Sequence, residues 1–238
     1  RLEFGLIIMK INVVTLFPDM ITNISEYGIV RRAKEKEIIS LDTTNPRDFT
    51  SDNYKKVDDR PYGGGPGMVM KYEPLKKAIN SAKSNLTDNS HVILLSPQGV
   101  KYDQKIARRL STLSNIILVS GRYEGIDQRL IDKHIDEEIS LGDYILSGGE
   151  IAAMSVIDSI VRLLPGSLGD NESSKDESFE DGLLEYPHYT RPEMVDGMKC
   201  PEILLSGNHK AIKQWRKKQS MISTSRNRPD LLKKFSKD

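Results

Sequence analysis

The sequence predicts an α/β fold built on a mainly parallel sheet. Short apolar segments alternate with longer segments of helical periodicity, which is typical of that class. Three polar loops that contain glycine follow three consecutive expected strands, at residues 96–99, 120–125 and 141–149. Ligands of parallel sheets bind beyond the carboxyl ends of the strands. We therefore expect the three loops to converge on one site, although each could also be an ordinary strand-to-helix turn.

Each element is assigned from its periodicity and its end signals. Strands are expected at residues 10–16, 38–44, 92–95, 116–119 and 137–140. Helices are expected at residues 20–36 with a break near Gly28, and at 72–85, 103–113, 126–134 and 149–164. The last of these helices is apolar on most faces, which predicts that it is largely buried. Residues 58–70 are expected to form a glycine-rich loop.

The chain of 238 residues is long enough for one good core and a small second domain. Residues 165–181 are rich in Gly, Ser and acidic residues, which indicates a linker. Residues 182–205 look irregular, Asn208 is expected to cap a helix that runs to about Ile222, and Pro229 to open a last short helix. We place the first domain at 9–168, a flexible linker at 169–181 and a mostly helical second domain at 182–238.

Cysteine content and hydropathy indicate a cytoplasmic protein. Cys200 is the single cysteine, so no disulfide can form within the chain. No apolar run approaches the roughly 20 residues of a membrane span. Residues 1–8 lack the features of a signal peptide, and Met9 opens the first strand pattern. We expect residues 1–8 to be an extension, a cloning remnant or the result of a misassigned start.

Charge is distributed unevenly, although the formal net charge is only +1. Residues 170–181 hold six acids and one Lys, whereas residues 209–237 hold ten Lys or Arg against Asp230. A basic end on a neutral chain indicates a contact surface for phosphates, or else a solvated helix face.

Several familiar sites are missing from the sequence. It has no G-x-x-x-x-G-K-[ST] phosphate loop, no G-x-G-x-x-G after a strand, no G-x-S-x-G elbow and no His/Cys cluster with metal-ligand spacing. A nucleotide-like ligand would therefore be held by an unusual set of loops.

Six motifs closely resemble the bacterial tRNA (guanine-N1)-methyltransferase family, which belongs to the SPOUT class. They are RPYGGGPGM at 60–68, LSPQG at 95–99, GRYEGID at 121–127, SLGDYILSGGE at 140–150, GLLEYPHYTRP at 182–192 and LSGNH at 205–209. The resemblance extends from Met9 to about Leu232, with the motifs in the family's order.

The resemblance implies a fold and a reaction. The fold would be a SPOUT-type, mainly parallel sheet with a deep trefoil knot formed by the three loops, in a homodimer whose active sites are shared between chains. The enzyme would transfer a methyl group from S-adenosyl-L-methionine to N1 of the tRNA guanosine immediately 3′ of the anticodon (position 37). The family also needs a divalent cation, normally Mg²⁺, whose site the sequence does not reveal.

The resemblance further implies which residues bind the cofactor. Glycines there would let the backbone approach the adenine ring. The implied set is Pro97, Gln98, Gly99, Gly121, Tyr123, Glu124, Gly125, Leu141, Gly142, Asp143, Tyr144, Ile145, Leu146, Gly148 and Gly149.

Catalysis needs a base, because neutral guanine carries a proton on N1, and a cation to stabilise the charge left on O6. The family places an Asp before Ser-Phe for the first task, whereas this sequence has Glu177 there, with Asp176 before it. We favour Glu177 as the base and keep Asp176 as the alternative. Arg162 matches the family's catalytic arginine, and a structural salt bridge is its other possible role.

The domain after the linker is expected to bind tRNA. Its candidate contacts are Lys210, Lys213, Arg216, Lys217, Lys218, His188 and Arg191. Three other interpretations remain: a SPOUT enzyme with another RNA target, a non-catalytic RNA-binding module, and an unrelated nucleotide-binding enzyme.

Overall fold

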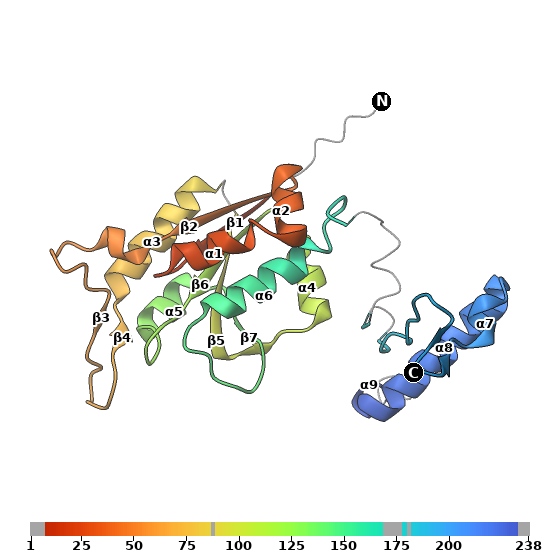
Figure 1. Ribbon diagram of the computed structural model, residues 1–238. Coiled ribbons are helices and arrows are strands. Elements are labelled where there is room, and N and C mark those ends of the chain that lie inside the picture. Colours follow the sequence, from red (N-terminus) through yellow and green to blue (C-terminus); the bar gives the residue numbers. More distant parts are fainter. Residues whose placement is uncertain (1–7, 87–88, 169–177, 180–181, 233–238) are drawn as a thin grey trace. The chain divides into compact units, whose positions relative to one another are not determined.

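The computed structural model describes residues 8–86, 89–168, 178–179 and 182–232. The chain divides into two compact units, residues 1–169 and 170–238, which we describe separately. The first unit contains a five-stranded sheet in the order β2-β1-β6-β5-β7, in which every neighbouring pair is parallel (Figure 1). Its strands are β1 (Met9–Val14), β2 (Ile39–Thr44), β5 (His91–Lys101), β6 (Asn115–Ser120) and β7 (Glu137–Ser140). The predicted α/β class with a parallel sheet is thus confirmed.

Helices cover both faces of this sheet (Figure 1). One face packs against α1 (Pro18–Ile24), α2 (Gly28–Glu35), α4 (Gln104–Ser111) and α6 (Glu150–Val161). The other face packs against α3 (Tyr72–Asn85) and α5 (Gln128–His134). Alternate residues of β6 serve the two cores: Ile116 and Leu118 face the first group, and Ile117 and Val119 the second. Successive side chains of a strand point to opposite faces, so a strand buried on both sides is apolar throughout.

Strand β5 is longer than the expected segment 92–95, because it pairs with β7 at two places. Both Leu95 and Val100 lie opposite Ile139 of β7, so the chain leaves the sheet after Leu95 and returns to the same strand. Residues 96–99 form the irregularity between these pairings. The predicted loop therefore lies inside a strand that pairs on both sides of it.

The expected glycine-rich loop at 58–70 has paired ends. Strands β3 (Asp58–Asp59) and β4 (Val69–Met70) form an antiparallel ladder, preceded in the chain by the 3₁₀ turn η1 (Pro46–Phe49). Helix α6 also ends earlier than expected, at Val161, and Arg162 is its C-cap residue.

The second unit contains more regular structure than we predicted for residues 182–205. Strands β8 (Met194–Val195) and β9 (Met198–Lys199) form a hairpin, and α7 (Glu202–Leu205) follows. The turn residues Asp196 and Gly197 have φ of 51° and 77°, as a two-residue hairpin turn requires. Asn208 caps α8 (His209–Asn227) by accepting a hydrogen bond from the Ala211 N–H at 3.1 Å, and α9 (Pro229–Leu232) begins at the expected proline.

Candidate functional site

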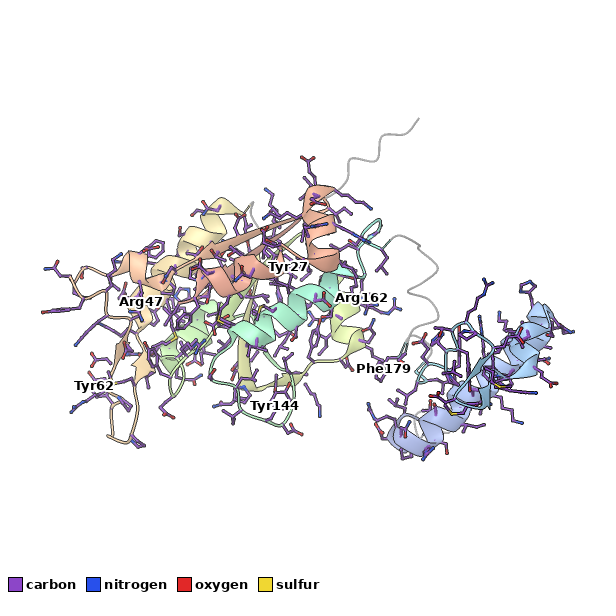
Figure 2. The ribbon with its side chains drawn as sticks, in the orientation of Figure 1. Tyr27, Arg47, Tyr62, Tyr144, Arg162 and Phe179 are labelled. Carbon is purple, nitrogen blue, oxygen red and sulfur yellow. The ribbon has the colours of Figure 1, made fainter. Side chains whose placement is uncertain are left out.

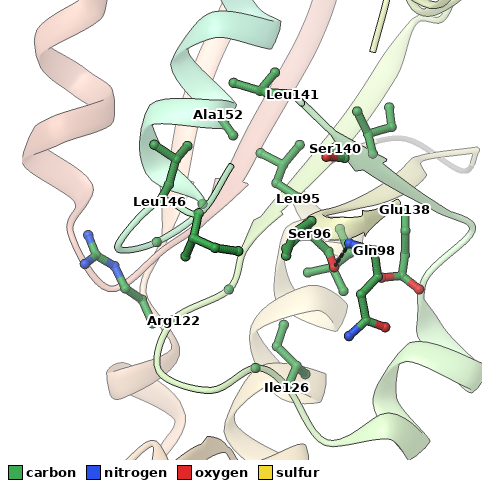
Figure 3. A pocket seen from close by; sticks show the side chains of 18 of the residues that line it. Leu95, Ser96, Gln98, Arg122, Ile126, Glu138, Ser140, Leu141, Leu146 and Ala152 are labelled. Carbon is green, nitrogen blue, oxygen red and sulfur yellow. Dashed lines mark hydrogen bonds between the residues drawn. The ribbon is translucent and has the colours of Figure 1, made fainter. Parts of the chain in front are cut away.

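A cavity of about 330 Å³ lies at the carboxyl ends of β6 and β7, next to the break in β5 at residues 96–99. Residues from segments 94–98, 121–126 and 138–149 line most of it (Figure 3). These strands are neighbours in the sheet, so their parallel ends bring the three loops to one edge. The volume lies at the lower end of the range for small-molecule sites. The expected convergence of the three loops is what the structure shows.

All but two of the residues that the family resemblance implied for the cofactor line this cavity. The exceptions are Gly99 and Asp143. Gly99 lies against the backbone of Glu138 and Ile139, where a Cβ would collide with them. The Asp143 side chain is 95% exposed, 3.7 Å from Lys101 Nζ. Cofactor binding by the whole implied set stays a prediction.

The second and third loops touch each other through their backbones. The Gly149 N–H donates a hydrogen bond to the Gly121 carbonyl at 2.9 Å. A Cβ on Gly149 would lie 2.7 Å from the Cα of Ser120, closer than real contacts of that kind. Glycine is therefore required at 149 for the start of α6 to reach the end of β6.

Strand β4 supports the second loop. The Glu124 N–H donates to the Met68 carbonyl at 2.9 Å, and the Met70 N–H donates to the Gly125 carbonyl at 2.9 Å. Tyr123 holds a positive φ of 61°, a costly conformation for a residue with a side chain. The stem of the glycine-rich hairpin thus fixes the strained loop that borders the cavity.

The loop ends at Asp127, which caps α5 by accepting a hydrogen bond from the Arg129 N–H at 3.0 Å. The Arg129 guanidinium donates to both carboxylate oxygens of Asp127, at 2.9 and 2.6 Å. These hydrogen bonds lower the pKa of Asp127 below its ordinary value, against a smaller opposing effect of burial. Asp127 therefore remains a charged cap at neutral pH.

The cavity wall combines an apolar side with carboxylates and amides. Leu95, Leu141, Leu146 and Ala152 form part of the apolar side (Figure 3). Polar side chains come from Ser96, Gln98, Glu124, Gln128 and Glu138. Of the lining residues, all of which the structure describes, Arg122 is the sole Lys or Arg, and its Nε lies 2.9 Å from the Glu150 carboxylate. The wall therefore suits a neutral or cationic ligand better than a phosphate.

Sequence reasoning missed Arg122 and Glu138 as residues of the cavity wall. Arg122 belongs to the GRYEGID motif, so the motif itself was a signal. Glu138 follows Glu137 in β7, and the alternation of strand side chains places the two on opposite faces. The alternation could therefore have predicted that Glu138 lines the cavity while Glu137, which binds Arg109, faces away from it.

The catalytic candidates are not brought to the cavity within the described part of one chain. Arg162 follows the last residue of α6, whose 12 residues span about 18 Å, whereas the cavity borders the first turn. Figure 2 shows Arg162 at the carboxyl end of α6 and Tyr144, a cavity residue, on the loop below this helix. Asp176 and Glu177 lie outside the described residues.

In the second unit, the expected tRNA-binding residues are exposed, with one exception. Lys210, Lys213, Lys217 and Lys218 on α8, and His188 and Arg191 before β8, have exposed side chains. Arg216 is only half-exposed, and its guanidinium lies 4.7 Å from the centre of the Tyr186 ring. Arg216 therefore helps to pack this unit, in addition to any contact with a ligand.

Trp215 also helps to pack the second unit. Its indole is half-buried, with its ring centre 6.4 Å from that of Tyr189. Among the described residues, no cluster of three His, Cys, Asp or Glu could hold a metal ion, and no helix is long and apolar enough to cross a membrane.

Parallel-sheet topology and a cavity made of loops at the carboxyl edge define an α/β protein with a small-molecule site at its sheet edge. The chain belongs to the tRNA (Guanine-1)-methyltransferase TrmD family, whose model matches residues 9–234. Relatives described as tRNA (guanine-N(1)-)-methyltransferase cover most of the chain. One from Methylococcus capsulatus is 55% identical over 94% of this chain and 89% of its own. One from Vibrio vulnificus is 50% identical over 96% of this chain and 92% of its own.

Proposed function

We propose that this chain transfers a methyl group from S-adenosyl-L-methionine to N1 of the tRNA guanosine immediately 3′ of the anticodon, position 37. Family membership and the descriptions of the relatives support the reaction class. The observation that carries the choice of cofactor is the charge of the cavity wall. Arg122, the sole Lys or Arg among the lining residues, is neutralised by Glu150, so the wall suits a nucleoside with a sulfonium and no phosphate.

The loops fit the parts of such a cofactor. Backbone groups of the glycine-containing loops can bind the adenine edge closely, and the apolar wall can cover its ring. The Glu124 and Glu138 carboxylates can attract the sulfonium and ammonium charges or accept hydrogen bonds from ribose hydroxyls. When bound, S-adenosyl-L-methionine supplies a methyl group on a positively charged sulfur, which makes the group electrophilic.

Residues of the protein would accept the N1 proton of guanine and stabilise the charge that develops on its O6. As the N1–methyl bond forms, the N1 proton passes to a carboxylate, which we assign to Glu177, with Asp176 as the alternative. The Arg162 guanidinium would stabilise the negative charge that develops on O6. Methylated guanosine and S-adenosylhomocysteine leave, and the carboxylate returns its proton to water.

A homodimer would complete the site. Within one chain, Arg162 lies about 18 Å along α6 from the end that borders the cavity. A second copy packed so that its Arg162 faces the first copy's cavity would remove this separation, as a shared active site requires. The dimer is therefore part of the proposed mechanism.

The knot is proposed on the same family grounds. Its support is the close passage of the loops: Gly99 lies against the backbone of β7, and Gly149 against that of β6. Deep threading of α6 past the second loop would account for the contact at Gly149.

The second unit is proposed to hold tRNA through the exposed lysines of α8, in a cytoplasmic enzyme. A Mg²⁺ requirement is the family's, but the described residues offer no cluster of carboxylates for an ion.

Methyl transfer to matched transcripts tests the proposal. One tRNA transcript would carry guanosine 3′ of the anticodon, and the other adenosine at the same place. We expect S-adenosyl-L-methionine to label only the first, with the methyl group on N1. Labelling of both transcripts would contradict the target, and absence of labelling despite cofactor binding would favour a non-catalytic RNA-binding module.

A further inference from the structure

We propose that Arg122 is a positioning residue for the methyl donor: paired with Glu150, it fixes loop 141–149 against loop 121–125 before the ligand binds. The inference rests on the proposed function only in naming the ligand as S-adenosyl-L-methionine. Both loops line the cavity, so their spacing determines its shape.

Arg122 connects the second loop to the third at two points. Its Nε donates a hydrogen bond to Glu150 Oε2 at 2.9 Å, and its Nη1 donates to the Ser147 carbonyl at 3.1 Å. Glu150 is the first residue of α6 and is 1% exposed. One planar guanidinium therefore holds both the backbone of loop 141–149 and the helix that follows it.

Two residues beyond β1 close the arrangement. The Thr15 hydroxyl donates to Glu150 Oε1 at 2.9 Å and accepts from the Phe17 N–H at 3.0 Å. The Phe17 ring lies 4.4 Å from the Arg122 guanidinium carbon. Thr15, Phe17, Arg122 and Glu150 thus form a closed ring of contacts, which we call the Arg122 ring. Each member is held by two others, so the geometry is determined from several directions.

The Arg122 ring fits a positioning role better than a purely stabilising one. Its guanidinium points away from Gln98 and Glu138, so it is not presented to a ligand in the middle of the cavity (Figure 3). Burying a charged pair costs desolvation that well-packed apolar side chains would avoid. A Cβ at Gly148 would overlap Arg122, so the third loop is fitted closely around this side chain.

The test compares Arg122→Met with Arg109→Met. Arg109 also donates to a carboxylate of the same sheet, Glu137 Oε1 at 2.6 Å, but at the amino end of β7. Calorimetric titration with S-adenosyl-L-methionine should show binding weaker by about 10- to 100-fold in Arg122→Met, because the competent loop geometry becomes a minor state. Arg109→Met should bind as the parent does, and KM for tRNA should be unchanged in both variants.

Hydrogen exchange gives a readout without ligand. The Gly149 amide, bonded to the Gly121 carbonyl, should exchange faster in Arg122→Met and at the parental rate in Arg109→Met. Parental affinity and exchange in Arg122→Met, or equal losses in both variants, would overturn the inference.

If Arg122→Met does not fold, Thr15→Val tests the positioning role of the Arg122 ring in its place. It removes one hydroxyl and keeps every charge, so Glu150 and the Phe17 N–H each lose one partner. We expect several-fold weaker cofactor binding and faster Gly149 exchange; parental values of both would overturn the inference. A parent protein that does not bind S-adenosyl-L-methionine would contradict the proposed function instead, and the exchange measurement would still test the Arg122 ring.

Discussion

At the scale of single residues, two glycines of adjoining loops have different structural requirements. A Cβ at Gly149 would lie 2.7 Å from the Ser120 Cα, which the flanking backbone cannot relieve without moving α6 or β6. A Cβ at Gly121 would meet the Ile126 side chain at 3.7 Å, an ordinary van der Waals contact. Each glycine belongs to one of the motifs, but only the structure separates their roles.

Gly149→Ala should therefore weaken S-adenosyl-L-methionine binding on the order of 100-fold, since a displacement of about 1 Å at such a site can cost that much. Gly121→Ala adds the same methyl group and should stay within a few-fold of the parent. Calorimetry measures both affinities. Equal affinities in the two variants would show that the contact between the second and third loops does not shape the site.

The proposed base gives a second prediction for a single residue. Glu177→Gln keeps the side-chain shape but removes the proton acceptor, so single-turnover methyl transfer should slow by about 10²- to 10⁴-fold. Cofactor and tRNA affinities should not change. Raising the pH should partly rescue this variant, because guanine N1 then loses its proton in solution.

Asp176→Asn is the matched control for that prediction. It neutralises the neighbouring carboxylate and should leave turnover near the parental rate. If Asp176→Asn abolishes turnover while Glu177→Gln does not, Asp176 is the base.

At the scale of secondary-structure elements, periodicity predicted most of the first unit, and the misses have local causes. The bounds of α3 and β7 match the expected segments, because a clear apolar pattern and clear end signals coincide there. Strand β5 was cut short, since its return to Ile139 is a long-range pairing that no local pattern encodes. The β8–β9 hairpin was overlooked although Asp196-Gly197 is a strong two-residue turn signal.

The residues of the candidate site were likewise predicted in part. Motif loops identified the cavity wall well, because its residues are contiguous in sequence. Arg122 was missed as a structural partner, since its contacts to Glu150 and Phe17 join segments far apart in the chain.

The amino end of β7 gives a prediction for pH dependence. Burial raises the pKa of Glu137, but hydrogen bonds from Arg109 and His91 outweigh it and hold the pKa below the ordinary value of 4.5. A carboxyl group with a lowered pKa stabilises the fold above pH 4.5, and this contribution is lost as pH falls through the folded-state pKa. Arg109→Met should therefore lower the melting temperature at pH 7, and the difference from the parent should shrink as the pH falls below 4.5. A constant difference down to pH 3 would contradict this origin.

At the scale of the whole molecule, the residues of the proposed active site lie far apart within one chain. The cavity borders the first turn of α6, Arg162 follows its last turn, and Glu177 lies outside the described residues. A helix is rigid over this length, so no adjustment within α6 brings Arg162 to the cavity. A two-fold dimer that lays one chain's Arg162 beside its partner's cavity gives two equivalent sites, as a closed interface implies.

Subunit complementation tests that arrangement. Arg162→Ala would leave the cavity intact, and Gly149→Ala would leave Arg162 intact; each homodimer should be nearly inactive at a cofactor concentration that saturates only the parent. In a mixed dimer with shared sites, the cavity of the Arg162→Ala chain meets the partner's unaltered arginine and should work. Random mixing after co-expression puts half of the dimers in this state with one working site of two, so activity should return to about a quarter of the parental value. If each site is complete within one chain, both sites of the mixed dimer stay defective, and co-expression should restore no activity.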